Sequence, residues 1–139
     1  MSSDTSSNNV VRSCECKAED IVLMPCSGGS NCGQIANQAA IDLTRQGKGR
    51  MYCLAGMGAH IKGMIESVKG ARRVVAIDGC NVACAKKTIE HADLPVTDWI
   101  CVTEEGIAKN KNFDLPAEQV ELIVRRTLES LSKAPAFVK

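Results

Sequence analysis

The residues with the clearest chemistry are eight cysteines, two of which lie four positions apart, at Cys80 and Cys84. If a helix begins at Cys80, one turn brings both sulfur atoms to the same side, with β-carbons about 6 Å apart. Two such thiolates can bind one Zn²⁺ ion through Zn–S bonds of about 2.3 Å. Zinc takes four ligands, or three and an open position, so Cys26 and Cys53 are the natural completions of a predicted zinc site.

The other four cysteines divide by their surroundings. Cys101 lies in an apolar segment, and free cysteine is among the most often buried residue types, so we expect it in the core. Cys32 is either a fifth metal ligand or a redox partner of Cys26. Cys14 and Cys16 lie in a polar stretch, where they are either adventitious ligands or oxidation-prone thiols.

Two other kinds of chemistry fit the same thiols. A thiol-dependent enzyme or redox protein would use Cys26 as its nucleophile, with Cys32 or Cys80 as the resolving thiol. Four thiolates also suit an iron–sulfur cluster. The segment from Cys26 to Cys32 has the length of a phosphatase Cys-x5-Arg loop, but a cysteine stands where that loop needs its phosphate-binding arginine. The sequence therefore argues against a phosphatase.

Size, charge and composition restrict the number of domains and the kinds of partner that the chain can have. The 139 residues allow one domain with a single core. Seventeen basic and sixteen acidic residues leave a net charge of +1, and only two Phe, one Tyr and one Trp could stack on bases, so we expect no nucleic-acid partner. No apolar run approaches the roughly 20 residues of a membrane span, so we expect no membrane association. The expected partner is a metal ion, bound by a monomer or weak oligomer.

The start of the chain bears on the state of the thiols. Residues 1–10 have neither the basic start nor the apolar centre of a secretory signal, which predicts a cytoplasmic protein. The cytosol keeps thiols reduced, so we interpret the cysteines as ligands, redox groups or buried side chains and not as a disulfide scaffold. Residues 1–19 are polar and aperiodic, which predicts a flexible tail ahead of a single domain at 20–139.

Short apolar runs alternate with segments of helical period from residue 20 onward, which is typical of βα units in a parallel sheet. We predict a compact three-layer α/β sandwich with a mostly parallel sheet. Its strands, about four in number, are expected at Ile21–Met24, Met51–Leu54, Arg73–Ile77 and Thr97–Val102. Helices are expected after these strands, from Ser30 or Asn31 to Gly47, from about Gly58 to Lys69, from Cys80 to His91, and from Pro116 onward.

These elements would gather the cysteines at one edge of the sheet. Cys26 follows the first predicted strand, Cys53 lies near the end of the second, Cys80 follows the third, and Cys101 lies near the end of the fourth. Right-handed crossovers bring the carboxyl ends of parallel strands to the same edge, where α/β proteins bind their ligands. Helix N-termini at that edge favour the thiolate, which is the form that binds metal or attacks an electrophile.

Four other polar side chains are weaker candidates for a role at this site. His60, near the start of the second predicted helix, is either a ligand or base or a solvated side chain. His91 lies at the end of the third, where a cation suits the helix dipole, so we expect a structural role. Asp78 and Asp98, near strand ends, are expected first as turn caps and second as partners of metal ligands.

Several short motifs occur in an order that is found in a known family. They are Pro25-Cys26-Ser27-Gly28, Asn37-Gln38-Ala39-Ala40, Cys53-Leu54-Ala55-Gly56, and Asp78-Gly79-Cys80 followed by Cys84. Over residues 20–131 the chain resembles the DGC-domain proteins, which are named for the Asp-Gly-Cys step. The resemblance implies a small α/β domain with four potential zinc-chelating residues, Cys26, Cys53, Cys80 and Cys84. It implies no substrate, so we interpret the chain as a zinc-binding protein that senses, delivers or structurally uses the metal.

Overall fold

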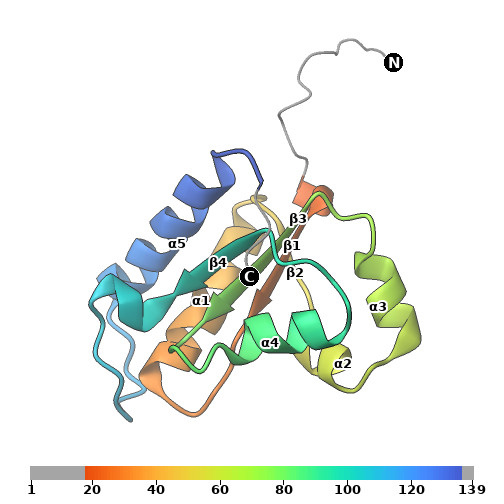
Figure 1. Cartoon of the computed structure of the whole chain (residues 1–139). Helices are drawn as coiled ribbons and strands as arrows, with labels where there is room; N and C mark the ends of the chain where they lie inside the picture. The colour runs from red at the N-terminus through yellow and green to blue at the C-terminus, as the bar shows by residue number, and fades with distance from the viewer. Residues whose placement is uncertain (1–17, 136–139) are drawn as a thin grey trace.

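A parallel β-sheet forms the centre of the structure, a computed structural model that describes residues 18–135 (Figure 1). Its strands lie in the order β2-β1-β3-β4, and every neighbouring pair is parallel. They are β1 (Ile21–Pro25), β2 (Arg50–Met51), β3 (Arg73–Asp78) and β4 (Asp98–Cys101). All residues of β1 and β3 are buried, as expected for central strands covered on both faces. The predicted α/β class and parallel sheet are confirmed.

Helices cover both faces of the sheet (Figure 1). They are α1 (Asn31–Arg45) and α5 (Ala117–Leu131) on one face, and α2 (Leu54–Gly58), α3 (Lys62–Val68) and α4 (Cys84–His91) on the other. Short 3-10 helices precede β1 and follow β4, at Ala18–Asp20 and Val102–Glu105. The three-layer prediction is therefore confirmed. In the described part of the chain, no helix has both the length and the apolar character needed to cross a bilayer.

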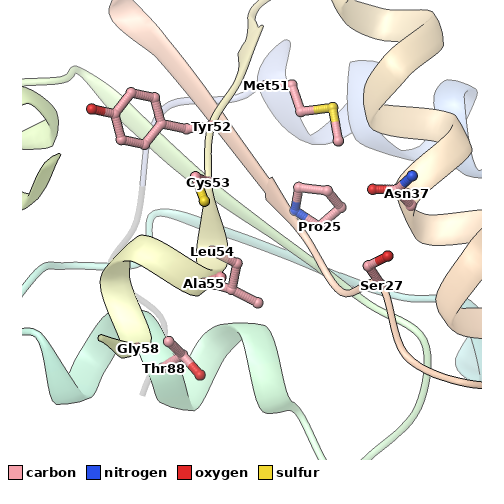
Figure 2. A pocket seen from close by; sticks show the side chains of 10 residues that line it. All are labelled: Pro25, Ser27, Asn37, Met51, Tyr52, Cys53, Leu54, Ala55, Gly58 and Thr88. Atoms are coloured by element: carbon pink, nitrogen blue, oxygen red, sulfur yellow. The ribbon is translucent and has the colours of Figure 1, made fainter. Parts of the chain in front are cut away.

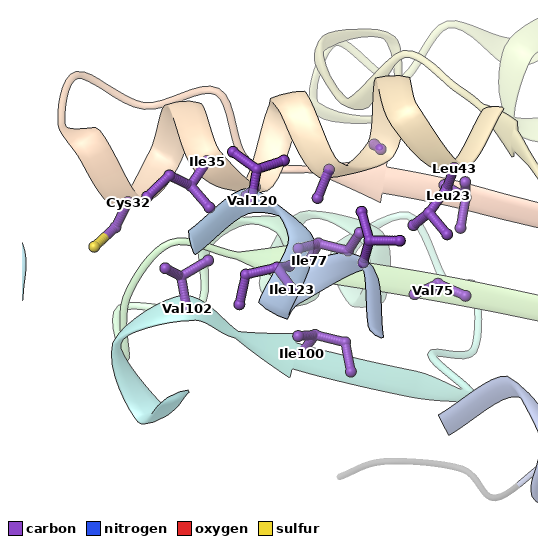
Figure 3. Close-up of a cluster of buried hydrophobic side chains, with 14 of the residues drawn as sticks. Leu23, Cys32, Ile35, Leu43, Val75, Ile77, Ile100, Val102, Val120 and Ile123 are labelled. Carbon is purple, nitrogen blue, oxygen red and sulfur yellow. The ribbon is translucent and has the colours of Figure 1, made fainter. Parts of the chain in front are cut away.

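Each central strand supplies side chains to two cores, because successive residues of a strand point to opposite faces. Leu23 packs on the α1 and α5 side, whereas Val22 and Met24 pack on the side of α2, α3 and α4. Figure 3 shows the first of these cores between the helices and the sheet. Val120 and Ile123 of α5 are buried in it, so the amphipathic pattern of that helix has the predicted inward face.

The second strand is shorter than predicted. It ends at Met51, because Leu54 is already the first residue of α2. Cys53 is the residue before that helix, two residues after the end of β2, so it lies near the end of the strand as predicted but not within it.

The helix predicted from about Gly58 to Lys69 begins earlier and is interrupted after Gly58. α2 ends in a Schellman motif, in which the amide of Ile61 donates to the carbonyl of Gly56 and that of His60 to Met57, both at 3.1 Å. His60 takes the left-handed conformation of this motif, with φ of 56°. Glycine usually occupies that position, and because histidine stands there the sequence pattern does not mark the break.

A buried ion pair joins the amino ends of β3 and β4. Arg73 donates to Asp98 from Nε at 3.0 Å and from Nη2 at 2.9 Å, and it also donates to the last carbonyls of α5, at Ser130 and Leu131. Burial alone would raise the pKa of Asp98, but hydrogen bonds from Arg73, Ser130 and Thr97 outweigh it and hold that pKa below its usual value. Asp98 thus fixes the end of α5 at the edge of the sheet opposite the predicted site.

The prediction for the start of the chain is not tested by the structure. The tail expected at residues 1–19, with Cys14 and Cys16 in it, lies outside the described residues except for its last two. Those two belong to the short helix at Ala18–Asp20 that leads into β1.

Candidate functional site

The strand order places a crevice between β1 and β3. After β1 the chain enters α1 on one face of the sheet, and after β3 it enters α4 on the other face. Connections that leave neighbouring strands in opposite directions open a crevice at their carboxyl ends, which is where open α/β sheets bind ligands. Cys26 directly follows β1 and Cys80 lies two residues after β3, so both cysteines flank this crevice.

A pocket of about 280 Å³ occupies the crevice and contains three of the four predicted ligands. Its lining residues are Cys26, Gly28, Gly29, Ser30, Gly33, Gly79, Cys80, Val82, Cys84, Lys109 and Lys111. The structure therefore brings together Cys26 from the loop after β1 and Cys80 and Cys84 from the connection between β3 and α4, and we refer to this hollow as the cysteine pocket.

The loop after β1 is held in place by the sheet and by α1. The amide of Cys26 donates to the carbonyl of Ile77 at 2.8 Å, which extends the β1–β3 pairing by one residue. The amide of Gly28 donates to Cys26 Sγ at 3.2 Å, so the loop folds back over its own thiol. Ser30 caps α1 by accepting from the amide of Gly33 at 3.2 Å, as one of the two predicted caps.

Three glycines allow the walls of the cysteine pocket to approach each other. A β-carbon on Gly79 would lie 2.7 Å from the amide nitrogen of Gly33, and one on Gly33 would lie 2.7 Å from that of Gly28. The loop after β1, the first turn of α1 and the turn after β3 therefore pack backbone to backbone. Local sequence patterns do not predict this role of Gly33, although its place next to a Gly-Gly loop is a usable signal.

Cys80 and Cys84 reach the pocket in a different way from the one predicted. α4 begins at Cys84, and Cys80 lies in the preceding turn, so the prediction that one helical turn carries both is wrong. The buried carboxylate of Asp78 accepts from the amides of Ala85 at 2.7 Å and Lys86 at 3.1 Å, and thereby caps α4 from the end of β3. This cap confirms the first role expected for Asp78 and sets where the helix can start.

A segment between β4 and α5, residues 107–112, closes one side of the pocket. Asn31 holds it: Nδ2 donates to the carbonyl of Ala108 at 2.8 Å, and Oδ1 accepts from the amide of Asn110 at 2.6 Å. Lys109 Nζ donates to Cys80 Sγ at 3.4 Å, and Lys111 Nζ donates to the carbonyl of Gly29. Neither lysine is predicted from the sequence, because nothing in a polar connection indicates that Lys109 contacts a cysteine 29 residues earlier in the chain.

Cys53, the fourth predicted ligand, lines a different pocket. This hollow of about 450 Å³ lies beside the cysteine pocket, and Figure 2 shows Cys53 facing it across from Pro25 and Ser27. Its thiol is exposed. Among residues 18–135, no three cysteine, histidine, aspartate or glutamate side chains form a group that could hold a metal ion as they stand.

Two cysteines belong to the protein interior. Cys32, the second residue of α1, has no exposed surface and lies at the end of the α1–α5 core in Figure 3. Burial raises the pKa of the Cys32 thiol, and nearby Cys80 raises it further. Cys101 is 3% exposed, which confirms the core position expected for it, and its thiol donates to Asn81 Oδ1 at 3.5 Å.

The two histidines contact each other. His60 Nε2 lies 3.1 Å from His91 Nδ1, and this exposed pair joins the turn after α2 to the end of α4. Neither lines the cysteine pocket.

Comparison with known proteins agrees with the motifs. Residues 22–127 match the DGC domain. AnvM, the anaerobic and virulence modulator of Pseudomonas aeruginosa, is 31% identical to this chain over 100 residues, which make up 72% of this chain and 76% of AnvM. No solved structure matches the chain. The DGC match includes every residue that lines the cysteine pocket, and the chain belongs to the DGC domain family.

Proposed function

We propose that this chain binds a thiophilic metal ion, Zn²⁺ in the first place, through the thiolates of Cys26, Cys80 and Cys84. We place it in the reducing cytosol and give it a regulatory role rather than an enzymatic one. The observation that carries the proposal is that these three thiols line one pocket at the crevice between β1 and β3. Thiolates are soft ligands, which favour zinc, copper(I) and iron–sulfur clusters over hard cations such as magnesium.

The number of thiols in the pocket bears on the kind of metal site. Three protein thiolates leave a fourth coordination position for water or for a donor from another molecule. Cys53 lines the neighbouring pocket, so it would become the fourth ligand only if the segment between β2 and α2 moved. Three protein thiolates with an exchangeable fourth ligand suit metal sensing or delivery better than a permanent structural site.

Metal binding would change the arrangement of the thiols. The side chains of Cys26, Cys80 and Cys84 would have to turn toward a common centre, and the Lys109 ammonium would have to leave the Cys80 sulfur. Each thiol that binds the ion must also lose its proton. Zinc binding should therefore release protons and strengthen as the pH rises.

The relative supports a regulatory role rather than a particular substrate. AnvM is named as an anaerobic and virulence modulator. We extend to this chain only the idea of modulation, because the match to AnvM covers most of both chains.

A thiol-dependent redox function is the second candidate, and the contact between Lys109 and Cys80 favours it. The pairing of Cys26 with Cys32 has less support, because Cys32 is fully buried and does not line the pocket. Cys80 shares the pocket with Cys26 and is the better partner.

Elemental mass spectrometry of the reduced protein tests the metal proposal. We expect about one zinc ion per chain after dialysis against a low concentration of free zinc that is enough to fill one site. Zinc affinity should fall at least about tenfold in Cys26→Ser, Cys80→Ser and Cys84→Ser. Cys53→Ser is the matched control, because it removes an exposed thiol from the neighbouring pocket. A zinc content that is unaffected by replacing Cys80 or Cys84 would overturn the proposal.

A further inference from the structure

We propose that Cys80, in the metal-free chain, exchanges with small anionic disulfides of the glutathione disulfide type, and that Lys109 and Lys111 select them by charge. This inference goes beyond metal binding, because it concerns the chain without a metal and assigns a role to two lysines that have none in the zinc proposal.

The charge of the cysteine pocket is the first argument. Of the residues that line it in the described part of the chain, two are lysines and none is an aspartate or glutamate. A hollow lined by charge of one sign concentrates ligands of the opposite sign and raises their rate of encounter. The pocket should therefore attract a disulfide that carries carboxylates and repel one that carries ammonium groups.

The position of Lys109 identifies the reacting thiol. Its ammonium lies 3.4 Å from Cys80 Sγ, so an anion held by this lysine also lies beside that sulfur. Cys26 and Cys80 are both half-buried in this pocket, but the lysine contacts the sulfur of Cys80, whereas the sulfur of Cys26 accepts from the amide of Gly28. Lys111 donates to the carbonyl of Gly29, which also lines the pocket, so both cations belong to the pocket into which Cys80 faces.

The exchange is a substitution at sulfur and needs no other reactant. The Cys80 thiolate attacks one sulfur of the disulfide RSSR, a new S–S bond forms to Cys80, and the bond within RSSR breaks. The leaving thiolate RS⁻ takes up the proton that the Cys80 thiol lost, so one thiol and one disulfide are converted into another thiol and a mixed disulfide. Cys80 and one half of RSSR are joined in the product, and the other half is reduced to RSH.

Cys53 provides an internal comparison. It is an exposed cysteine in the adjacent pocket, and no charged residue of the described chain lines that pocket. The two thiols can therefore be followed in the same sample, and any difference in charge preference between them reports the surroundings of Cys80.

The test uses the full chain, reduced and kept metal-free with a chelator. It is treated at low ionic strength with glutathione disulfide, which is anionic, or cystamine, which is cationic, and modification of each cysteine is followed by peptide mass spectrometry. We expect the rate ratio of glutathione disulfide to cystamine to be about tenfold higher at Cys80 than at Cys53. High salt should reduce this difference, because the lysines are at the surface.

Charge-neutral variants complete the test. Lys109→Gln with Lys111→Gln should bring the ratio at Cys80 down to that at Cys53, whereas Lys48→Gln, after α1 at the other edge of the sheet, should leave it unchanged. Equal ratios at both cysteines in the unaltered chain, or a preference that survives loss of both pocket lysines, would overturn the inference. Zinc binding is measured in a separate experiment, so the disulfide-exchange proposal can fail while the zinc proposal holds, and the reverse.

Discussion

Gly79 lies so close to Gly33 that a β-carbon on Gly79 would be 2.7 Å from the Gly33 amide nitrogen. This contact joins the turn after β3 to the first turn of α1. It also explains the middle residue of the Asp-Gly-Cys step: the aspartate caps α4, the glycine packs on α1, and the cysteine enters the pocket. Each of the three residues of the motif therefore has a separate structural role at the site.

Substitution of this glycine should loosen the site. Gly79→Ala forces a methyl group against backbone atoms that cannot move aside easily, so we expect a loss of about 1–3 kcal/mol in the free energy of unfolding, measured with urea. Gly63→Ala is the control, because a β-carbon there meets nothing within 4 Å and alanine favours the α3 helix. If both variants are as stable as the parent chain, the close packing does not constrain the turn.

The ion pair between Arg73 and Asp98 should dominate the acid sensitivity of the fold. Asp98→Asn leaves a buried guanidinium without its carboxylate, so we expect a loss of about 3–5 kcal/mol at pH 7. Asp93→Asn, at an exposed left-handed position that asparagine tolerates, should change stability by less than about 0.5 kcal/mol.

The pH dependence of this pair has a defined sign. The pKa of Asp98 is lower in the folded chain than in the unfolded one, so its contribution is complete above the unfolded value of about 4. It is lost as the pH falls from there through the folded value. Urea unfolding between pH 7 and pH 3 should therefore show a smaller acid loss in Asp98→Asn than in the parent, and equal losses would contradict this account.

Asn31 should control the segment that carries the two pocket lysines. Asn31→Ala removes the hydrogen bonds to Ala108 and Asn110, so we expect faster amide hydrogen exchange across residues 107–112 and weaker charge preference at Cys80. Gln38→Ala on the same helix removes only a bond to Asp42 and should change neither. Unaltered exchange in Asn31→Ala would mean that other contacts hold the segment.

The alternation of apolar runs and helical periods was enough to predict the architecture. The runs at Ile21 and Arg73 became the two fully buried central strands, because a parallel strand covered on both faces is apolar at nearly every position. The amphipathic pattern of α5 likewise predicted its buried face. The break after α2 was missed because His60, and not glycine, adopts the left-handed conformation there.

The candidate site was predicted in part. Strand ends alone place Cys26 and Cys80 at one edge, and both line the pocket. The helical spacing of Cys80 and Cys84 was misleading, because Asp78 caps α4 at Ala85 and leaves Cys80 in a turn. Which pocket Cys53 lines, and the approach of Lys109, depend on long-range packing that local sequence patterns do not encode.

The central claim is that Cys26, Cys80 and Cys84 act as one metal-binding unit, and site-resolved alkylation tests it most directly. The reduced chain is treated with a maleimide at increasing zinc concentrations, and each cysteine is followed by peptide mass spectrometry. We predict that the three pocket thiols lose reactivity together at about one zinc ion per chain, while Cys53 stays reactive. Unchanged alkylation of the three, or protection at different zinc concentrations, would contradict the account.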